Sequence, residues 1–130
     1  MFMVDRLSAF RPQALALLRI MTALLFIEHG TQKFFDFPPA EQPFGNLMNI
    51  IGVAGALEIV GGLLILVGLF TRPAAFVLCG FMAVAYFMAH APQSFFPINN
   101  RGDAAILFSF VFLYLTVAGP GAFALDNRRV

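Results

Sequence analysis

The chain has 130 residues, of which 60% are hydrophobic and 12% charged, and 17 of them are phenylalanine. A soluble domain of this size could not cover so much apolar surface, so the composition excludes a water-soluble globular protein. The net charge of +1 says nothing about partners. The basic residues Arg128 and Arg129 are explained more simply as a topology anchor than as a nucleic-acid site, and no nucleic-acid partner is expected.

Four apolar blocks follow one another along the chain, separated by Pro, Gly, Asn and charged residues. They cover roughly residues 14–35, 47–70, 73–91 and 103–124. Each block approaches or reaches the roughly twenty residues that a membrane-spanning helix requires. Since lipid offers no hydrogen bonds to the backbone, the blocks are expected to be helices rather than strands. The sequence therefore predicts an all-α integral membrane protein, a four-transmembrane-helix bundle forming a single domain over residues 1–130.

The first block also has features of a secretory signal, because Arg6 and Arg11 precede an apolar run. The run is longer than the apolar core of a signal, carries Arg19 inside it, and is followed by EHGTQK rather than a small-residue cleavage site. We therefore expect it to be a helix of the mature protein.

The orientation of the bundle follows from the basic residues in its short connections. One side would hold Arg6, Arg11, Arg72, Arg128 and Arg129, and the other Lys33 and Arg101. The excess of positive charge predicts that both termini are cytoplasmic, in a multi-pass protein of a prokaryotic inner membrane.

Ionisable residues interrupt all four apolar blocks. They are Arg19, Glu28, His29 and Lys33 in the first block, Glu58 in the second, His90 in the third and Asp103 in the fourth. Ionisable groups at membrane depth are costly, so they are candidates for function. The predicted topology puts His29, Lys33, His90 and Asp103 in the outer half of the bilayer, Arg19 in the inner half and Glu58 between them. We expect a polar pocket toward the outer leaflet, lined by phenylalanines and floored by Glu58.

Helical periodicity predicts which residues share a face. Gly55, Glu58 and Gly62 fall on one face of the second block, which places the Glu58 carboxylate against a closely packed neighbour rather than lipid. In the first block a shared face holds Arg19, Thr22, Phe26, His29, Gly30 and Lys33, and Glu28 points away from it. Further stripes are Cys79, Met82, Tyr86 and His90 in the third block and Asp103, Phe110 and Tyr114 in the fourth.

Structural explanations compete with the functional ones for several of these residues. Arg19 and Lys33 are long enough to snorkel to the lipid headgroups. Asp103 precedes an apolar run and is a good candidate for a helix N-cap. A structural explanation is weakest for Glu58, because a carboxylate in the middle of a spanning helix cannot reach the membrane–water interface.

Cys79 is the single cysteine of the chain. One thiol cannot cycle through an internal disulfide, so the chain alone cannot oxidise a dithiol. Its simplest interpretation is a small hydrophobic core residue.

Three motifs in order, HGTQK, EIVGGLLILVGLFTR and HAPQSFFPINNRGD, resemble those of the DoxX family of small four-helix membrane proteins. The family pattern maps onto His29, Gly30, Gln32, Lys33, Glu58, Gly61, Gly62, Gly68, Thr71, Arg72, His90, Pro92, Phe95, Phe96, Pro97, Asn99, Gly102 and Asp103. The resemblance covers nearly the whole chain. It implies the four-helix fold and an association with thiosulfate:quinone oxidoreductase and other membrane oxidoreductase complexes.

The sequence favours a quinone-linked oxidoreductase subunit. In this hypothesis His29, His90 and either Tyr86 or Tyr114 hydrogen-bond the carbonyls of a quinone, Glu58 and Asp103 exchange protons with it, and phenylalanines pack against its ring. The other predicted binding residues are Lys33, Gln32, Arg19 and Asn99. A partner protein must supply electrons, because the chain has neither paired cysteines nor a dinucleotide-binding pattern.

Two alternatives remain open. In the first, His29 and His90 ligate a haem or a metal, although no Glu-x-x-His pair or similar ligand spacing is present. In the second, the chain is a non-catalytic transport or assembly subunit that forms homo-oligomers through buried charges and glycine faces. Glu28, which points away from the other polar residues, is the feature that most favours this second alternative.

Overall fold

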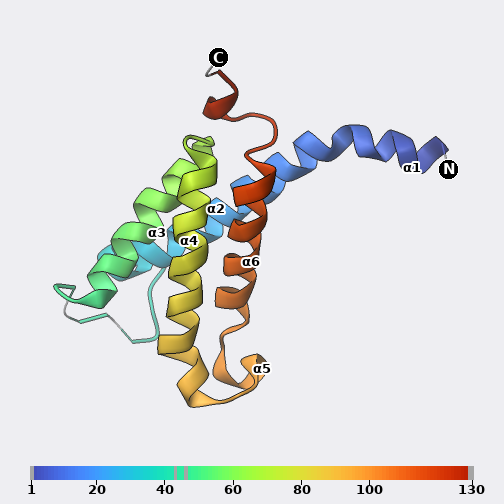
Figure 1. Ribbon diagram of the computed structural model, residues 1–130. Helices are drawn as coiled ribbons and strands as arrows, with labels where there is room; N and C mark the ends of the chain where they lie inside the picture. Colours follow the sequence, from blue (N-terminus) through green and yellow to red (C-terminus); the bar gives the residue numbers. More distant parts are fainter. Residues whose placement is uncertain (1, 43, 46, 129–130) are drawn as a thin grey trace. The chain divides into compact units, whose positions relative to one another are not determined.

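The structure is a computed structural model that describes residues 2–42, 44–45 and 47–128. Every regular element in this part of the chain is helical (Figure 1). The helices form two compact units. Unit 1 comprises the residues up to Phe70 together with those from Pro120 onward, and unit 2 comprises Thr71–Gly119.

Unit 1 is built on two long helices that pack against each other, α2 (Arg11–Phe35) and α3 (Ile50–Val67). The short helices α1 (Phe2–Leu7) and η1 (Ser8–Phe10) precede α2, and η4 (Leu125–Arg128) lies near the end of the chain. At the start of α3 the Asn49 side chain caps the helix by accepting a hydrogen bond of 2.9 Å from the Ile51 amide. The helix ends at Gly68, whose φ of 69° is left-handed and therefore suits glycine.

Unit 2 is a helical hairpin of α4 (Thr71–Ala85) and α6 (Asp103–Ala118), which pack against each other. The turns between them continue α4 as a π-helix, η2 (Tyr86–His90), and a 3-10 helix, η3 (Ala91–Gln93), followed by the short α5 (Pro97–Asn100). Figure 1 shows these elements from yellow to orange, below the hairpin. A π-helix widens the helix locally and is frequent at functional sites.

Three helical stretches are long and apolar enough to cross a membrane: Phe2–Phe35, Ile50–Val67 and Thr71–Gln93. The prediction of an all-helical membrane protein is thereby confirmed. The fourth apolar helix, α6, has 16 residues, so its length of about 24 Å is less than the roughly 30 Å of a bilayer core. The cytoplasmic location of the termini stays a prediction, and Arg129 lies outside the described residues.

The last apolar block differs from its predicted extent, because α6 ends at Ala118 instead of continuing to residue 124. Gly119 leaves the helix with a φ of 81°, and Pro120 follows it. The chain then returns to unit 1, where the Ala122 amide donates to the Pro12 carbonyl at 2.9 Å. Further along, the Asp126 amide donates to the Gly68 carbonyl at 2.9 Å, so residues 120–128 are tied to both long helices of unit 1.

Candidate functional site

The most buried charge pair of the described residues joins α2 to α3. The ammonium nitrogen of Lys33 lies 2.8 Å from Glu58 Oε1 and 3.1 Å from Oε2. The side chain of Glu58 is 4% exposed and that of Lys33 is 16% exposed. Both residues lie within stretches that are able to span a membrane. The pair is thus a charged, hydrogen-bonded group held away from water, which is costly unless both partners stay in register.

Glycines position this pair by letting the two helices approach closely. A Cβ added at Gly30 would lie 2.6 Å from Ile59 Cγ1 and 2.8 Å from the Gly55 carbonyl oxygen, and one at Gly62 would lie 2.5 Å from Ile27 Cγ1. No larger residue fits there without moving a neighbour. The α-helix continues through Gly30, so this glycine serves the close approach of the helices and does not interrupt α2.

The surroundings of Lys33 come from the end of α2 and the loop after it. Its Nζ lies 3.4 Å from the His29 carbonyl and 5.4 Å from the centre of the Phe44 ring, a cation–π distance. The His29 imidazole is exposed, and so is Glu28. Unit 1 therefore brings the charges of Lys33 and Glu58 together, and the backbone carbonyl of His29 lies beside them.

Gln32 and its neighbours hold the loop that follows α2. The Gln32 side-chain amide donates to the Pro38 carbonyl at 3.2 Å, and the Thr31 hydroxyl donates to the Phe37 carbonyl at 2.6 Å. The Asp36 carboxylate accepts from the Ala40 amide at 3.0 Å. The structure therefore gives Gln32 a role in shaping the loop beside Lys33.

Arg19 is fully buried at 0% exposure. Its guanidinium donates to the carbonyl oxygens of Pro120, of Ala122 at 3.0 Å and of Phe123 at 2.9 Å. Snorkelling to the headgroups is therefore the wrong interpretation of Arg19, because both terminal guanidinium nitrogens donate to backbone carbonyls inside unit 1. A planar guanidinium with five donors suits several carbonyls at once. The turn residues GPGAF at the end of the fourth block supply these carbonyls.

A second polar cluster, within unit 2, joins η2 to α5. His90 Nδ1 lies 3.0 Å from the Asn100 carbonyl oxygen, and the rings of Tyr86 and His90 are stacked with centroids 6.3 Å apart. Asn100 is fully buried at 0% exposure and donates from Nδ2 to the Tyr86 hydroxyl at 3.1 Å. Tyr86, His90 and Asn100 are called the η2 cluster below.

Sequence reasoning missed Asn100 and selected its neighbour Asn99, which is exposed. Both asparagines precede Arg101, which adopts a left-handed φ of 61°. A side-chain amide followed by such a turn is a signal for local capping, and Asn100 Oδ1 does accept from the Gly102 amide at 2.8 Å. That turn signal was available in the sequence.

Asp103 is not the N-cap of α6, as one structural explanation had it. Gly102 occupies that position, and Asp103 is the first helical residue, with an exposed side chain. Its carboxylate still lies at the positive end of the helix dipole. Tyr114 is 54% exposed, further along the same helix. The predicted pocket that combines residues of both units stays a prediction.

Cys79 is half-buried and contacts the facing helix. Its Sγ lies 3.6 Å from Ser109 Oγ, and the Ser109 hydroxyl donates to the Cys79 carbonyl at 3.0 Å. These contacts fit the interpretation of Cys79 as a packing residue. Within the part of the chain that the structure describes, no group of three or more His, Cys, Asp or Glu side chains lies close enough to hold a metal ion.

The long apolar helices, with the Lys33–Glu58 ion pair and the η2 cluster, define a small multi-pass membrane protein. The DoxX family model matches residues 14–91. The chain belongs to the DoxX family, and it is a protein of the bacterial inner membrane.

Three relatives match this chain over most of their length. It is 46% identical to an uncharacterised protein of Haemophilus influenzae, covering 96% of this chain and 97% of the relative. It is 30% identical to the inner membrane protein YphA of Escherichia coli, covering 93% and 94%. It is 33% identical to a Bacillus subtilis protein named "Putative oxidoreductase CatD", covering 85% and 82%. No solved structure matches the chain.

Proposed function

We propose that this protein is a quinone-linked subunit of a membrane oxidoreductase complex, and that the Lys33–Glu58 pair exchanges protons with the quinone. The observation that carries the proposal is the burial of this pair inside membrane-spanning helices. Apolar residues of similar volume would fill the same space with no desolvation cost, so a buried ion pair is weak evidence for a purely stabilising role. The similarity to the relative named as an oxidoreductase supports the same reaction class.

The chemistry requires two electrons and two protons for each quinone that is reduced to hydroquinone. The electrons come from a partner redox protein, because the chain has one cysteine and no dinucleotide-binding pattern. The Lys33 ammonium is able to donate a hydrogen bond to a quinone oxygen as negative charge develops there. Glu58, hydrogen-bonded to the same ammonium, is able to relay one of the two protons to that oxygen, and the second proton is taken up by the other quinone oxygen.

The first test is the quinone content of the protein purified in mild detergent, measured by mass spectrometry of an organic extract. We expect about one quinone per chain in the wild type and a strongly reduced amount in Glu58→Gln, which keeps the shape but removes the charge. Glu41→Gln is the matched control, because Glu41 is exposed in the loop after α2. Equal quinone in Glu58→Gln and the wild type would contradict the role of the pair, and absence of quinone from all samples would contradict the proposed function.

A second candidate function is that of an assembly subunit that associates with another copy of itself. Glu28 favours it, because its carboxylate is exposed on a helix that is able to span the membrane, and such a group is stabilised by a polar neighbour. Native mass spectrometry from detergent and from lipid nanodiscs tests this candidate. It predicts an oligomer that Glu28→Gln weakens, and a monomer in both media would contradict it.

A further inference from the structure

Asn100 is the centre of the η2 cluster, and the hydrogen-bonding capacity of its side-chain nitrogen is fully used. Its Nδ2 donates to the Tyr86 hydroxyl at 3.1 Å and to the Ser94 carbonyl at 2.9 Å. Its Oδ1 accepts from the Gly102 amide at 2.8 Å. A fully buried amide bonded in this way holds its partners in one orientation. The Asn100 side chain thus fixes the Tyr86 hydroxyl, and the backbone carbonyl of the same residue contacts His90 Nδ1 at 3.0 Å.

The tautomer of His90 follows from its partner. Nδ1 lies 3.0 Å from the carbonyl oxygen of Asn100, and a carbonyl oxygen only accepts. Nδ1 therefore carries the proton in the neutral ring. The other nitrogen, Nε2, then has a lone pair and is a hydrogen-bond acceptor. His90 is half-buried, so this acceptor belongs to a side chain that is partly open to its surroundings.

The Tyr86 hydroxyl has the complementary role. It accepts the hydrogen bond from Asn100 Nδ2, so its own proton stays available for donation. The two rings are stacked at an interplanar angle of 23°. The η2 cluster therefore presents one fixed acceptor and one donor on neighbouring rings.

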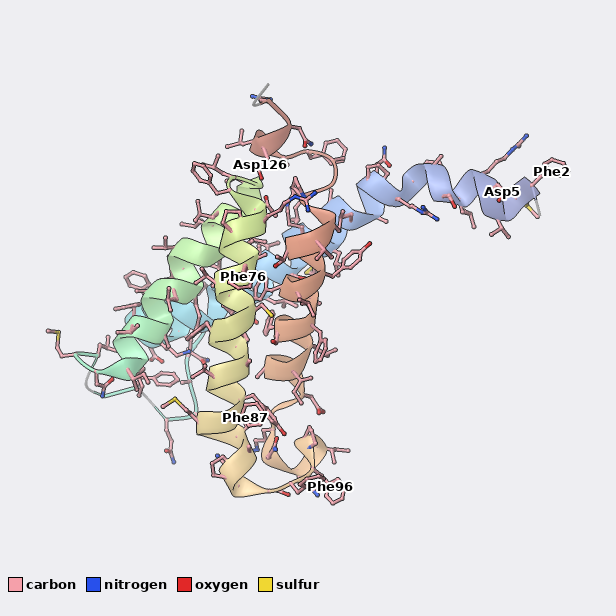
Figure 2. The ribbon with its side chains drawn as sticks, viewed as in Figure 1. Phe2, Asp5, Phe76, Phe87, Phe96 and Asp126 are labelled. Carbon is pink, nitrogen blue, oxygen red and sulfur yellow. The ribbon has the colours of Figure 1, made fainter. Side chains whose placement is uncertain are left out.

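Exposed phenylalanines lie in the same turns of unit 2 as the cluster. Phe87 meets Tyr86 edge to face with centroids 5.3 Å apart, and Phe95 and Phe96 form another edge-to-face pair in the turn before α5 (Figure 2). These three phenylalanines are 69%, 86% and 60% exposed. They offer apolar surface to a ligand that has an aromatic ring.

We propose that the η2 cluster binds the hydroxyl group of a hydroquinone, with Asn100 as the positioning residue. The hydroquinone hydroxyl donates a hydrogen bond to His90 Nε2 and accepts one from the Tyr86 hydroxyl, so both protein groups have a hydrogen-bond partner. A quinone carbonyl only accepts, so it would leave His90 Nε2 without a partner. The site thus distinguishes the reduced from the oxidised form of the ring. The choice of a hydroquinone as ligand rests on the proposed function.

The two histidines of the chain make a direct spectroscopic test available. Protein labelled with 15N-histidine gives two sets of ring nitrogen signals, which a His29→Gln variant assigns. We expect the Nδ1–H tautomer at His90. Anaerobic addition of 2,3-dimethoxy-5-methylhydroquinone should shift the His90 Nε2 signal, and the corresponding quinone should shift it much less. An Nε2–H tautomer, or equal responses to the two forms, would overturn the inference.

Variants separate positioning from contact. Tyr86→Phe keeps the ring and removes the hydroxyl, so it should weaken hydroquinone binding about tenfold, the equivalent of about 1.4 kcal/mol, without changing the His90 tautomer. Asn100→Ala keeps the backbone carbonyl that contacts His90 Nδ1 but removes the amide that holds the Tyr86 hydroxyl, so it should weaken binding and leave the His90 tautomer unchanged. Gln42→Ala, at an exposed amide in the loop after α2, is the control and should change neither the tautomer nor binding. Unchanged binding in Tyr86→Phe would contradict the site even if Asn100→Ala does not fold.

The outcome for this site is distinguishable from that for the proposed function. In one outcome, wild-type protein carries a quinone through purification while its His90 signal does not respond to added hydroquinone. In that case the η2 cluster is not the binding site, and the proposed function stands. If the sample retains no quinone and His90 also gives no response, both proposals fail.

Discussion

The two units stabilise their buried polar groups in different ways. In unit 1 the buried polar set includes two charged residues, Arg19 and Glu58, whereas in unit 2 the buried polar residues are the neutral Thr71 and Asn100. Removing a charge from water costs several kcal/mol, and removing a neutral amide or hydroxyl costs less. Unit 1 therefore depends on keeping each charge with its partners, and unit 2 depends on the orientation of its neutral groups.

The helices of the two units also approach each other differently. Gly30, Gly55 and Gly62 are positions where α2 and α3 have no room for a side chain, whereas a Cβ at Gly80 in α4 would meet nothing within 4 Å. In unit 2 the contact includes the hydrogen bond from Ser109 to the Cys79 carbonyl. The glycines of unit 1 bring the helix axes close enough for a lysine on one helix to reach a glutamate on the next.

Of the substitutions that test this comparison, Arg19→Met is expected to lower the free energy of unfolding most. The substitution keeps a long side chain but leaves the carbonyls of Pro120, Ala122 and Phe123 without their donor. We expect the free energy of unfolding in mixed micelles to fall by about 3–5 kcal/mol, and residues 120–128 to become sensitive to protease. Arg11→Met is the control, since Arg11 is exposed on the same helix. A loss below about 1 kcal/mol would show that the buried charge contributes little to unit 1.

An intermediate effect is expected when the close approach of the helices is blocked. In Gly30→Ala the new methyl group would lie 2.6 Å from Ile59 Cγ1 and 2.8 Å from the Gly55 carbonyl oxygen, so the helices must separate. We expect a loss of about 1–3 kcal/mol in the free energy of unfolding. Gly80→Ala is the matched control, and it should be neutral or stabilising by up to about 1 kcal/mol. If the two substitutions changed the free energy of unfolding equally, the helices of unit 1 would not be packed more closely than those of unit 2.

The smallest effect is expected in the neutral contact of unit 2. Ser109→Ala removes one hydroxyl that donates to the Cys79 carbonyl. We expect a loss of about 0.5–1.5 kcal/mol, measured by the same unfolding assay. Ser94→Ala provides a comparison, because Ser94 contacts Asn100 through its backbone carbonyl rather than its hydroxyl. A loss of stability as large as that of Arg19→Met would contradict the view that the neutral buried groups of unit 2 cost less to bury than the charges of unit 1.

Much of the fold was predictable because composition and block length constrain a membrane protein strongly. The apolar blocks gave the helices, and the spacing of Gly55, Glu58 and Gly62 gave the packed face of α3. The fourth block extends to residue 124 because hydrophobic residues continue through residues 119–124, but the sequence of Gly119, Pro120 and Gly121 predicts a break, and α6 does end at Ala118.

The partners of individual side chains were harder to predict. Helical periodicity placed Arg19 and Lys33 on one face of the first block, and both lie on the side of α2 that packs inside unit 1. It could not show that Arg19 would meet carbonyls more than 100 positions away along the chain. In the same way, the choice between Asn99 and Asn100 depended on the left-handed turn at Arg101. Contacts set by the return of the chain or by a turn have no periodic signal.

The central claim is that the Lys33–Glu58 pair is present for chemistry with a quinone rather than for stability. The most direct test replaces both residues at once, in Lys33→Met/Glu58→Leu, and measures the retained quinone together with the free energy of unfolding. Apolar residues of similar volume often replace a buried ion pair without loss of stability. We therefore predict a free energy of unfolding within about 1 kcal/mol of the wild-type value, together with loss of the quinone. A double variant that retains its quinone at the wild-type level would contradict the claim.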